Sequence, residues 1–384
     1  MPVVLDRPSV WQRLRPLLSA FDGPLALAIL ALATLGLVTM YSVGYDHGTR
    51  FNDHGRNMLL GFGLMLALAH VPLQRLQALA VPLYVIGVTL LVATALFGIT
   101  KKGATRWLNV GVVIQPSEIL KLAMPLMMAW WFQRREGQLD ARDFALGGLL
   151  LAVPVLLVAK QPDLGTSILI ASGGLYVMFF AGLSWKLILP VMLTGAIGIT
   201  TLVLMGDGLC QPDVVWKVLR EYQKQRVCTL LDPTADPLGK GFHILQGLIA
   251  IGSGGLSGKG FMSGTQTHLE FIPERTTDFI FAGFGEEFGL LGGLTLMICF
   301  FCLIARGLQI ATRAPTMFGR LLAGALSMSF FTYAFVNMGM VSGILPVVGV
   351  PLPFISYGGT AMVTLGLALG MLMAISRSES LMQR

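Results

Sequence analysis

Long apolar stretches alternate with short polar segments along this 384-residue chain. A helix needs about 20 apolar residues to cross the hydrocarbon core of a membrane. The second and fourth stretches given below are short, so either their flanks extend them or they lie partly in the interface. The pattern predicts an all-α polytopic membrane protein with about ten transmembrane helices, which cover Pro24–Val43, Met58–Val71, Leu79–Ile99, Ile119–Phe132, Phe144–Ala159, Thr166–Leu183, Leu187–Met205, Phe279–Ala305, Leu321–Met340 and Ala361–Ile375.

The composition supports a membrane protein, since 12% of the residues are charged, against about 25% in soluble globular proteins. No cleavable signal peptide is expected, because the first apolar stretch is long and lacks a small-residue cleavage site. We therefore expect residues 1–384 to form a single integral membrane domain.

The Lys and Arg residues predict the orientation of the chain. Ten spans put both ends on one side, and thirteen Lys and Arg residues fall in the segments on that side, against six in the short loops opposite. Cytoplasmic loops carry such an excess of positive charge. Residues 1–22 and 376–384 are thus expected in the cytoplasm and the long loop 206–278 outside. Nucleic-acid binding is not expected, because the net charge of +7 mostly reflects this bias.

Polar residues gather in two of the shorter outer segments. In Lys101–Met124, an interfacial turn with Trp107 is followed by a helix that starts at Pro116 and carries Glu118 and Lys121 one turn apart. These two residues either neutralise each other or line a cavity, and we expect them to act as a coupled pair. In the next polar turn, Asp163 either caps the following helix or belongs to a site.

The long outer loop is expected to contain two unusual helices. Residues Asp213–Arg226 have an amphipathic pattern, typical of a helix on the outer leaflet or of an ordinary solvated loop helix. Phe242–Ile251 is too short to span and fits a half-inserted helix. Cys210 and Cys228 share the loop, and we hypothesise that a disulfide between them holds the amphipathic helix.

Two further outer segments are marked by Gly and Pro. Gly258-Lys259-Gly260 is not a Walker A motif, because Ser253 and Gly260 stand where Gly and Ser or Thr are required. Its glycines are explained either by a flexible turn or by close contact with a pyrophosphate. The prolines of Asn337–Thr360 predict a rigid outer connection, which either lines a lipid-chain groove or only caps the bundle.

Asp278 lies where the outer loop meets the eighth predicted span, within the stretch Phe271–Glu287. It either caps that helix or serves as a general base. Glu286 and Glu287 lie deeper by about 12 Å, too far to share its proton directly. The spacing lets Glu286 face the same cavity, whereas Glu287 is expected to point away.

Six motifs stand together in the outer segments: GATRWLNVG, QPSEILK, QPDLGT, YQKQRVCTLLDPTADPLGKGFHILQGLIAIGSGGLSGKG, GTQTHLEFIPERTTDFIFAGFGEEFG and NMGMVSGILPVVGVPLPFISYGGT. In these motifs the chain closely resembles the SEDS family of shape, elongation, division and sporulation proteins, from Pro24 to Ser376. Its sequence is more similar to the rod-shape branch than to the division branch. Thr276 stands where the family commonly has His, and Cys228 where it usually has an apolar residue.

The resemblance implies a peptidoglycan glycosyltransferase of the bacterial cytoplasmic membrane, which polymerises lipid II on undecaprenyl pyrophosphate at the outer face. It implies that Asp278 is catalytic and that Trp107, Glu118, Lys121 and Asp163 shape the cavity. It also implies partners, namely a class B penicillin-binding protein and membrane proteins of the elongation machinery. Two alternatives stay open, a lipid II flippase and a non-catalytic scaffold.

The chemistry implied by the resemblance requires a base for the attacking hydroxyl and positive charge for the departing pyrophosphate. From the residues themselves we expect Arg226 and Lys240 to contact that pyrophosphate. A divalent cation is the other candidate for this task, and no cofactor is specified by the sequence.

Overall fold

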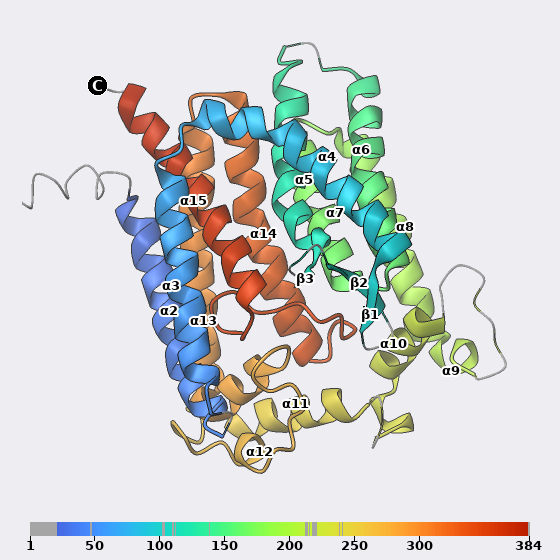
Figure 1. The fold of residues 1–384 in the computed structure, drawn as a ribbon. Coiled ribbons are helices and arrows are strands. Elements are labelled where there is room, and N and C mark those ends of the chain that lie inside the picture. Colours follow the sequence, from blue (N-terminus) through green and yellow to red (C-terminus); the bar gives the residue numbers. More distant parts are fainter. Residues whose placement is uncertain are drawn as a thin grey trace, which may run out of the picture.

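The computed structural model describes residues 21–382 except 47, 102–103, 110, 112, 138, 212–213, 215, 217–220, 238 and 240. Ten long helices form the body of the molecule (Figure 1). They are α2 (Gly23–Val43), α3 (Arg50–Ala69), α4 (Leu73–Phe97), α5 (Pro116–Gln133), α6 (Ala141–Lys160), α7 (Leu164–Phe180), α8 (Trp185–Leu204), α13 (Ile280–Arg313), α14 (Met317–Val341) and α15 (Gly359–Met382).

Each of these helices coincides with one predicted span, so the all-α polytopic prediction is confirmed. Seven of them are long and apolar enough to cross a membrane; α3, α5 and α7 are not among the seven. The two short predicted spans correspond to α3 and α5, and both helices extend beyond the apolar stretch. Their flanks therefore lengthen both helices, as the first of the two explanations expected.

A small antiparallel sheet between α4 and α5 was not predicted. Its strands are β1 (Ile99–Lys101), β2 (Ala104–Asn109) and β3 (Val113–Ile114), in the order β1-β2-β3. The segment was expected to form an interfacial turn. Pairing of β2 with both neighbours satisfies backbone groups that a turn alone would leave open.

The long outer loop contains α9 (Gly206–Leu209), α10 (Glu221–Leu231), the 3-10 helix η1 (Pro233–Ala235), α11 (Phe242–Gly254) and α12 (Thr265–His268). The half-inserted segment is helical as predicted. The amphipathic helix was placed too early, because Val214 and Trp216 are not helical and α10 continues to Leu231. The rest of its predicted first half lies outside the described residues.

Close packing joins α3 to α15, α13 to α2 and α14, and α14 to α7. Helix α8 is different, since it has no buried residue and stands at the edge of the bundle (Figure 1). The start of α2 and the end of α15 lie at the end of the bundle opposite to α10, α11 and α12 (Figure 1). The polar outer segments are therefore gathered at one end of the molecule.

Candidate functional site

Asp278 lies in the last turn before α13 and is half-buried. The helix begins at Ile280, and Phe279 rather than Asp278 occupies its N-cap position. Asp278 therefore lies one residue before the cap. Its backbone carbonyl accepts a hydrogen bond from Asn337 Nδ2 of α14 at 3.0 Å, which fixes the acid against the bundle.

The segment after α14 closes over Asp278. Gly349 has a φ of +73°, and a Cβ atom at this position would lie 3.3 Å from Asp278 Oδ2. Asn337 Nδ2 also donates to the carbonyl of Val350 at 2.7 Å. One buried amide thus holds both Asp278 and the backbone that faces its carboxylate. The proline-rich segment between α14 and α15 is not helical, as its prolines predicted.

Glu118 and Lys121 form an ion pair of 2.6 Å in the first turns of α5. The Lys121 side chain is 6% exposed, and its ammonium lies 5.6 Å from the centre of the Tyr333 ring on α14. Thr364 Oγ1 of α15 donates to Glu118 Oε2 at 3.3 Å. The predicted coupling of the pair is confirmed, and the pair joins three helices. Lys121 also borders a small cavity between α14 and α15, lined in part by Tyr333, Thr364 and Ala368.

Asp163 is the N-cap of α7, where its side chain accepts from Thr166 N at 3.2 Å. The same carboxylate accepts from Gln115 Nε2, directly before α5, at 3.1 Å. Arg106 of β2 lies 3.9 Å from it and donates to the carbonyl of Gln161. Asp163 is therefore both a cap and the junction of the sheet, α5 and α7. Trp107 follows Arg106 in β2 and is half-buried.

Two contacts connect these residues to Asp278. Tyr333 and Asn337, which contact Lys121 and Asp278 respectively, are four residues apart on α14, so they lie on one face about 6 Å apart along the axis. On α7, a Cβ atom at Gly165 would lie 2.7 Å from the carbonyl of Val348. The structure thus brings Asp278, the Glu118–Lys121 pair and Asp163 to one end of the bundle.

Glu286 was expected to be able to face the cavity of Asp278, and the structure instead places it against the glycine-rich segment. Its buried carboxylate accepts from Lys259 Nζ at 2.7 Å and from the backbone N–H groups of Gln266 and Thr267. Glu287 points elsewhere, as expected, and accepts from Ser42 Oγ at 2.5 Å. Glu286 therefore organises the outer loop.

The glycine-rich segment itself lies against α13. Lys259 N and Gly260 N donate to the carbonyls of Glu286 and Glu287, both at 3.0 Å. A Cβ atom at Gly258 would lie 2.0 Å from the Glu287 carbonyl oxygen. This close backbone approach accounts for a glycine here without a phosphate ligand.

The structure describes only one of the two cations that were expected to contact pyrophosphate. Arg226 lies in α10, and its Nη1 donates to the carbonyl of Val347 at 2.6 Å. Lys240 lies outside the described residues.

The hypothesis of a disulfide is confirmed, since Cys210 and Cys228 are bonded with a Cα–Cα distance of 5.6 Å.

Sequence reasoning missed a polar cavity beside the site. Its volume is about 500 Å³, and its lining includes Thr276, two residues before Asp278 in the sequence. Arg50 donates to Thr276 Oγ1 and packs over the Tyr357 ring at 4.8 Å. The lining residues are Asp46, Arg50, Glu270, Ile272, Glu274, Arg275 and Thr276. The Pro-Glu-Arg-Thr-Thr run was the available sequence signal, since it contains three of the seven lining residues.

The described part of the chain contains no group of three or more His, Cys, Asp or Glu side chains that could hold a metal ion.

Replacing Gly165 with Ala tests the contact between α7 and the loop over Asp278. The new Cβ would lie 2.7 Å from a backbone oxygen, so the loop must move, and we expect roughly a 10- to 100-fold loss of activity because small misplacements near a reacting centre are costly. Gly148→Ala is the matched control, since nothing lies within 4 Å of its Cβ position. Equal activity of both variants would show that the contact has no role.

Comparison with known proteins gives consistent results over nearly the whole chain. A family model described as a cell cycle protein, FtsW, RodA and SpoVE, matches residues 24–381. The chain is 47% identical over 366 residues to the peptidoglycan glycosyltransferase MrdB of Escherichia coli strain K12, with 94% of this chain and 95% of that protein covered.

Solved structures give the same family. One, described as a peptidoglycan synthase complex that coordinates polymerization and crosslinking, matches with a TM-score of 0.76 and 29% identity, over 94% of this chain and 98% of the other. The rod shape determining protein RodA of Thermus thermophilus matches with a TM-score of 0.68 and 27% identity, over 94% and 97% of the two chains. This chain belongs to the FtsW, RodA and SpoVE family of cell cycle proteins, the SEDS family.

Proposed function

We propose that this SEDS protein is a peptidoglycan glycosyltransferase that polymerises lipid II into glycan strands during cell-wall elongation. Its relative MrdB carries that enzyme name at 47% identity. The observation that carries the proposal is the position of Asp278. Asp278 is half-buried one residue before the N-cap of α13, its carbonyl accepts from Asn337, and Gly349 faces its carboxylate.

Asp278 acts as the general base in a single displacement. It accepts the proton of the attacking sugar hydroxyl while that oxygen forms the new glycosidic bond to the donor's anomeric carbon. The bond from this carbon to the pyrophosphate breaks, and its electron pair leaves with undecaprenyl pyrophosphate. The configuration is inverted, and no glycosyl-enzyme intermediate forms.

The other predicted residues support this step. Glu118, Lys121 and Asp163 connect α5 to α7 and α15, and we propose that they shape the substrate cavity together with Trp107. Lys121, Lys240 and Arg50 are candidates to neutralise the pyrophosphate, because cations aimed at a departing anion stabilise the transition state. Glu286 acts indirectly, since it organises the glycine-rich segment through Lys259.

The proposed orientation places both ends of the chain in the cytoplasm and the site outside, in a multi-pass protein of the bacterial inner membrane. The charge bias of the loops supports it. The described ends of the chain also lie opposite to the outer loop (Figure 1). Residues 1–22 and 376–384 are then cytoplasmic segments, and 206–278 is extracytoplasmic.

We also propose that the protein works with a class B penicillin-binding protein and with membrane proteins of the elongation machinery. The structural match to a complex that coordinates polymerization with crosslinking supports the first of these partners.

Reconstitution of the purified protein in liposomes with labelled lipid II tests the proposed function. Glycan formation and movement of lipid between leaflets are measured in the same samples. We expect glycan. Lipid movement without glycan would favour the flippase, and neither product, with the partner present, would favour the scaffold.

A further inference from the structure

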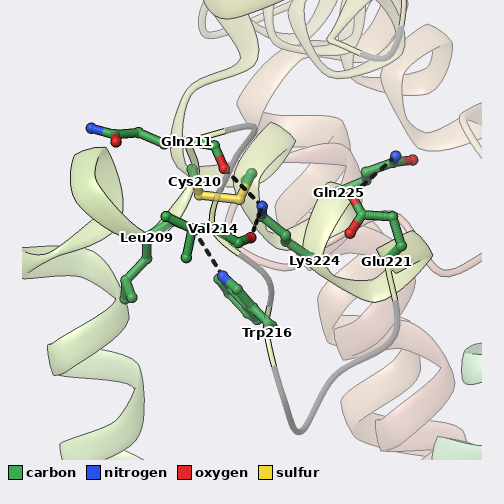
Figure 2. The surroundings of a disulfide bond; sticks show 9 residues. Leu209, Cys210, Gln211, Val214, Trp216, Glu221, Lys224 and Gln225 are labelled. Carbon is green, nitrogen blue, oxygen red and sulfur yellow. Dashed lines mark hydrogen bonds between the residues drawn. A yellow bond between two sulfur atoms is a disulfide. The ribbon is translucent and has the colours of Figure 1, made fainter.

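The disulfide joins Cys210, at the end of α9, to Cys228 in the second half of α10 (Figure 2). Both ends of this link depend little on packing. Helix α8 has no buried residue, and Lys224 is the only buried side chain among those described in α10. A cavity of about 700 Å³ lies beside the disulfide and is lined by both cysteines. The covalent bond therefore fixes a helix that packing leaves weakly held.

Two further contacts hold the same segment (Figure 2). Lys224 Nζ donates to the carbonyls of Gln211 and Val214, at 2.8 and 2.5 Å. Trp216 Nε1 donates to the carbonyl of Leu209 at 2.8 Å. All these partners lie within a few residues of Cys210, so the disulfide and Lys224 together set the position of α10.

Helix α10 reaches the reaction centre through Arg226, two residues before Cys228. Its guanidinium donates to the carbonyl of Val347 at 2.6 Å. Two residues later, the left-handed Gly349 faces Asp278 Oδ2, and the next carbonyl, of Val350, is held by Asn337. The segment Val347–Val350 is therefore fixed at one end by α10 and at the other by α14.

We propose that Arg226 is a positioning residue, held in place by the Cys210–Cys228 disulfide, which fixes Val347–Val350 against Asp278. The inference rests on the proposed function and gives Arg226 a role other than contact with pyrophosphate. It makes the rate of polymerisation depend on the oxidised state of the outer loop. A bond in this loop persists only in an oxidising compartment.

Reduction of the native protein with a dithiol is the first test. Two electrons and two protons convert the disulfide to two thiols, while the dithiol becomes a disulfide. We expect kcat for glycan synthesis to fall about tenfold with little change in KM, because misplacement of a catalytic group lowers turnover. Reoxidation should restore it. A variant with Cys299→Ala and Cys302→Ala, which removes only the other two thiols, must respond in the same way.

A double-mutant cycle is the second test. Arg226→Ala and the pair Cys210→Ala, Cys228→Ala should each lower kcat about tenfold, and the combined variant should be no worse than either, because residues acting through one contact are not additive. Arg226→Lys keeps a donor for Val347 and should restore most of the rate. Losses that multiply, or a raised KM as the main effect of Arg226→Ala, would overturn the proposal.

The same experiments separate this inference from the proposed function. Oxidised wild-type protein that makes no glycan contradicts the proposed function. Oxidised protein that makes glycan and keeps its kcat after complete reduction contradicts only the role of the disulfide.

Discussion

Purified Asp278→Asn protein should fold, insert in the membrane and keep its partner, yet make almost no glycan. Asparagine preserves the size of the side chain and can keep its contacts, but it cannot accept a proton. General bases contribute about 100- to 10,000-fold to rates, so we expect a loss of kcat in that range with KM nearly unchanged. The measurement is the initial rate of lipid II polymerisation at equal amounts of folded protein.

Asp232→Asn is the matched control for this variant. Asp232 is also an outer-loop aspartate, and hydrogen bonds from the Thr234 side chain and backbone lower the pKa of its carboxyl group. Its role is to cap η1, which Asn also does well, so the rate should stay close to wild type. A rate for Asp278→Asn within a factor of about three of the control would remove Asp278 as the base, since base catalysis is worth far more.

The second large effect is expected from breaking the buried pair on α5. In Lys121→Ala, Glu118 loses its partner in a site where the Lys121 side chain was 6% exposed. Removing one member of a buried ion pair costs about 3–5 kcal/mol, because the other charge stays buried and unpaired. We expect a clearly lower melting temperature in detergent and little activity.

The double variant Glu118→Gln, Lys121→Met separates stability from function. Both charges are gone, so most of the lost stability should return, whereas the activity should not if the pair shapes the substrate cavity. Arg56→Ala is the control, because it breaks the ion pair between Arg56 and Asp53, which has the same spacing along a helix. The Arg56 side chain is 68% exposed, and such a surface pair contributes about 0–1 kcal/mol. Normal stability and activity of Lys121→Ala would make the pair peripheral.

Much of the fold was predictable because a membrane span is a local property of sequence. Each apolar stretch must satisfy its own backbone, so length and composition are enough to place α2 or α14. The sheet was missed because β1 and β3 are only 3 and 2 residues long, and neither contains a full alternating pattern. Short strands are defined by their partners rather than by their own residues.

The candidate site was predictable where its residues lie within one turn or one motif. Glu118 and Lys121 are one turn apart, and the spacing alone suggested their contact. The contacts of Glu286 with Lys259 and of Arg226 with Val347 join residues 27 and 121 positions apart, and no local pattern marks them. The predicted cap position of α13 was off by one residue, because the helix begins at Ile280 with Phe279 at its N-cap position.

The most direct test of the central claim is glycan synthesis by the purified, oxidised wild-type protein from labelled lipid II, with any partner transpeptidase blocked by a β-lactam. The products are separated by size on a gel. We expect a ladder of uncrosslinked strands that muramidase digests and that is absent with Asp278→Asn. Unconverted lipid II with the folded wild-type protein, both alone and with its partner, would contradict it.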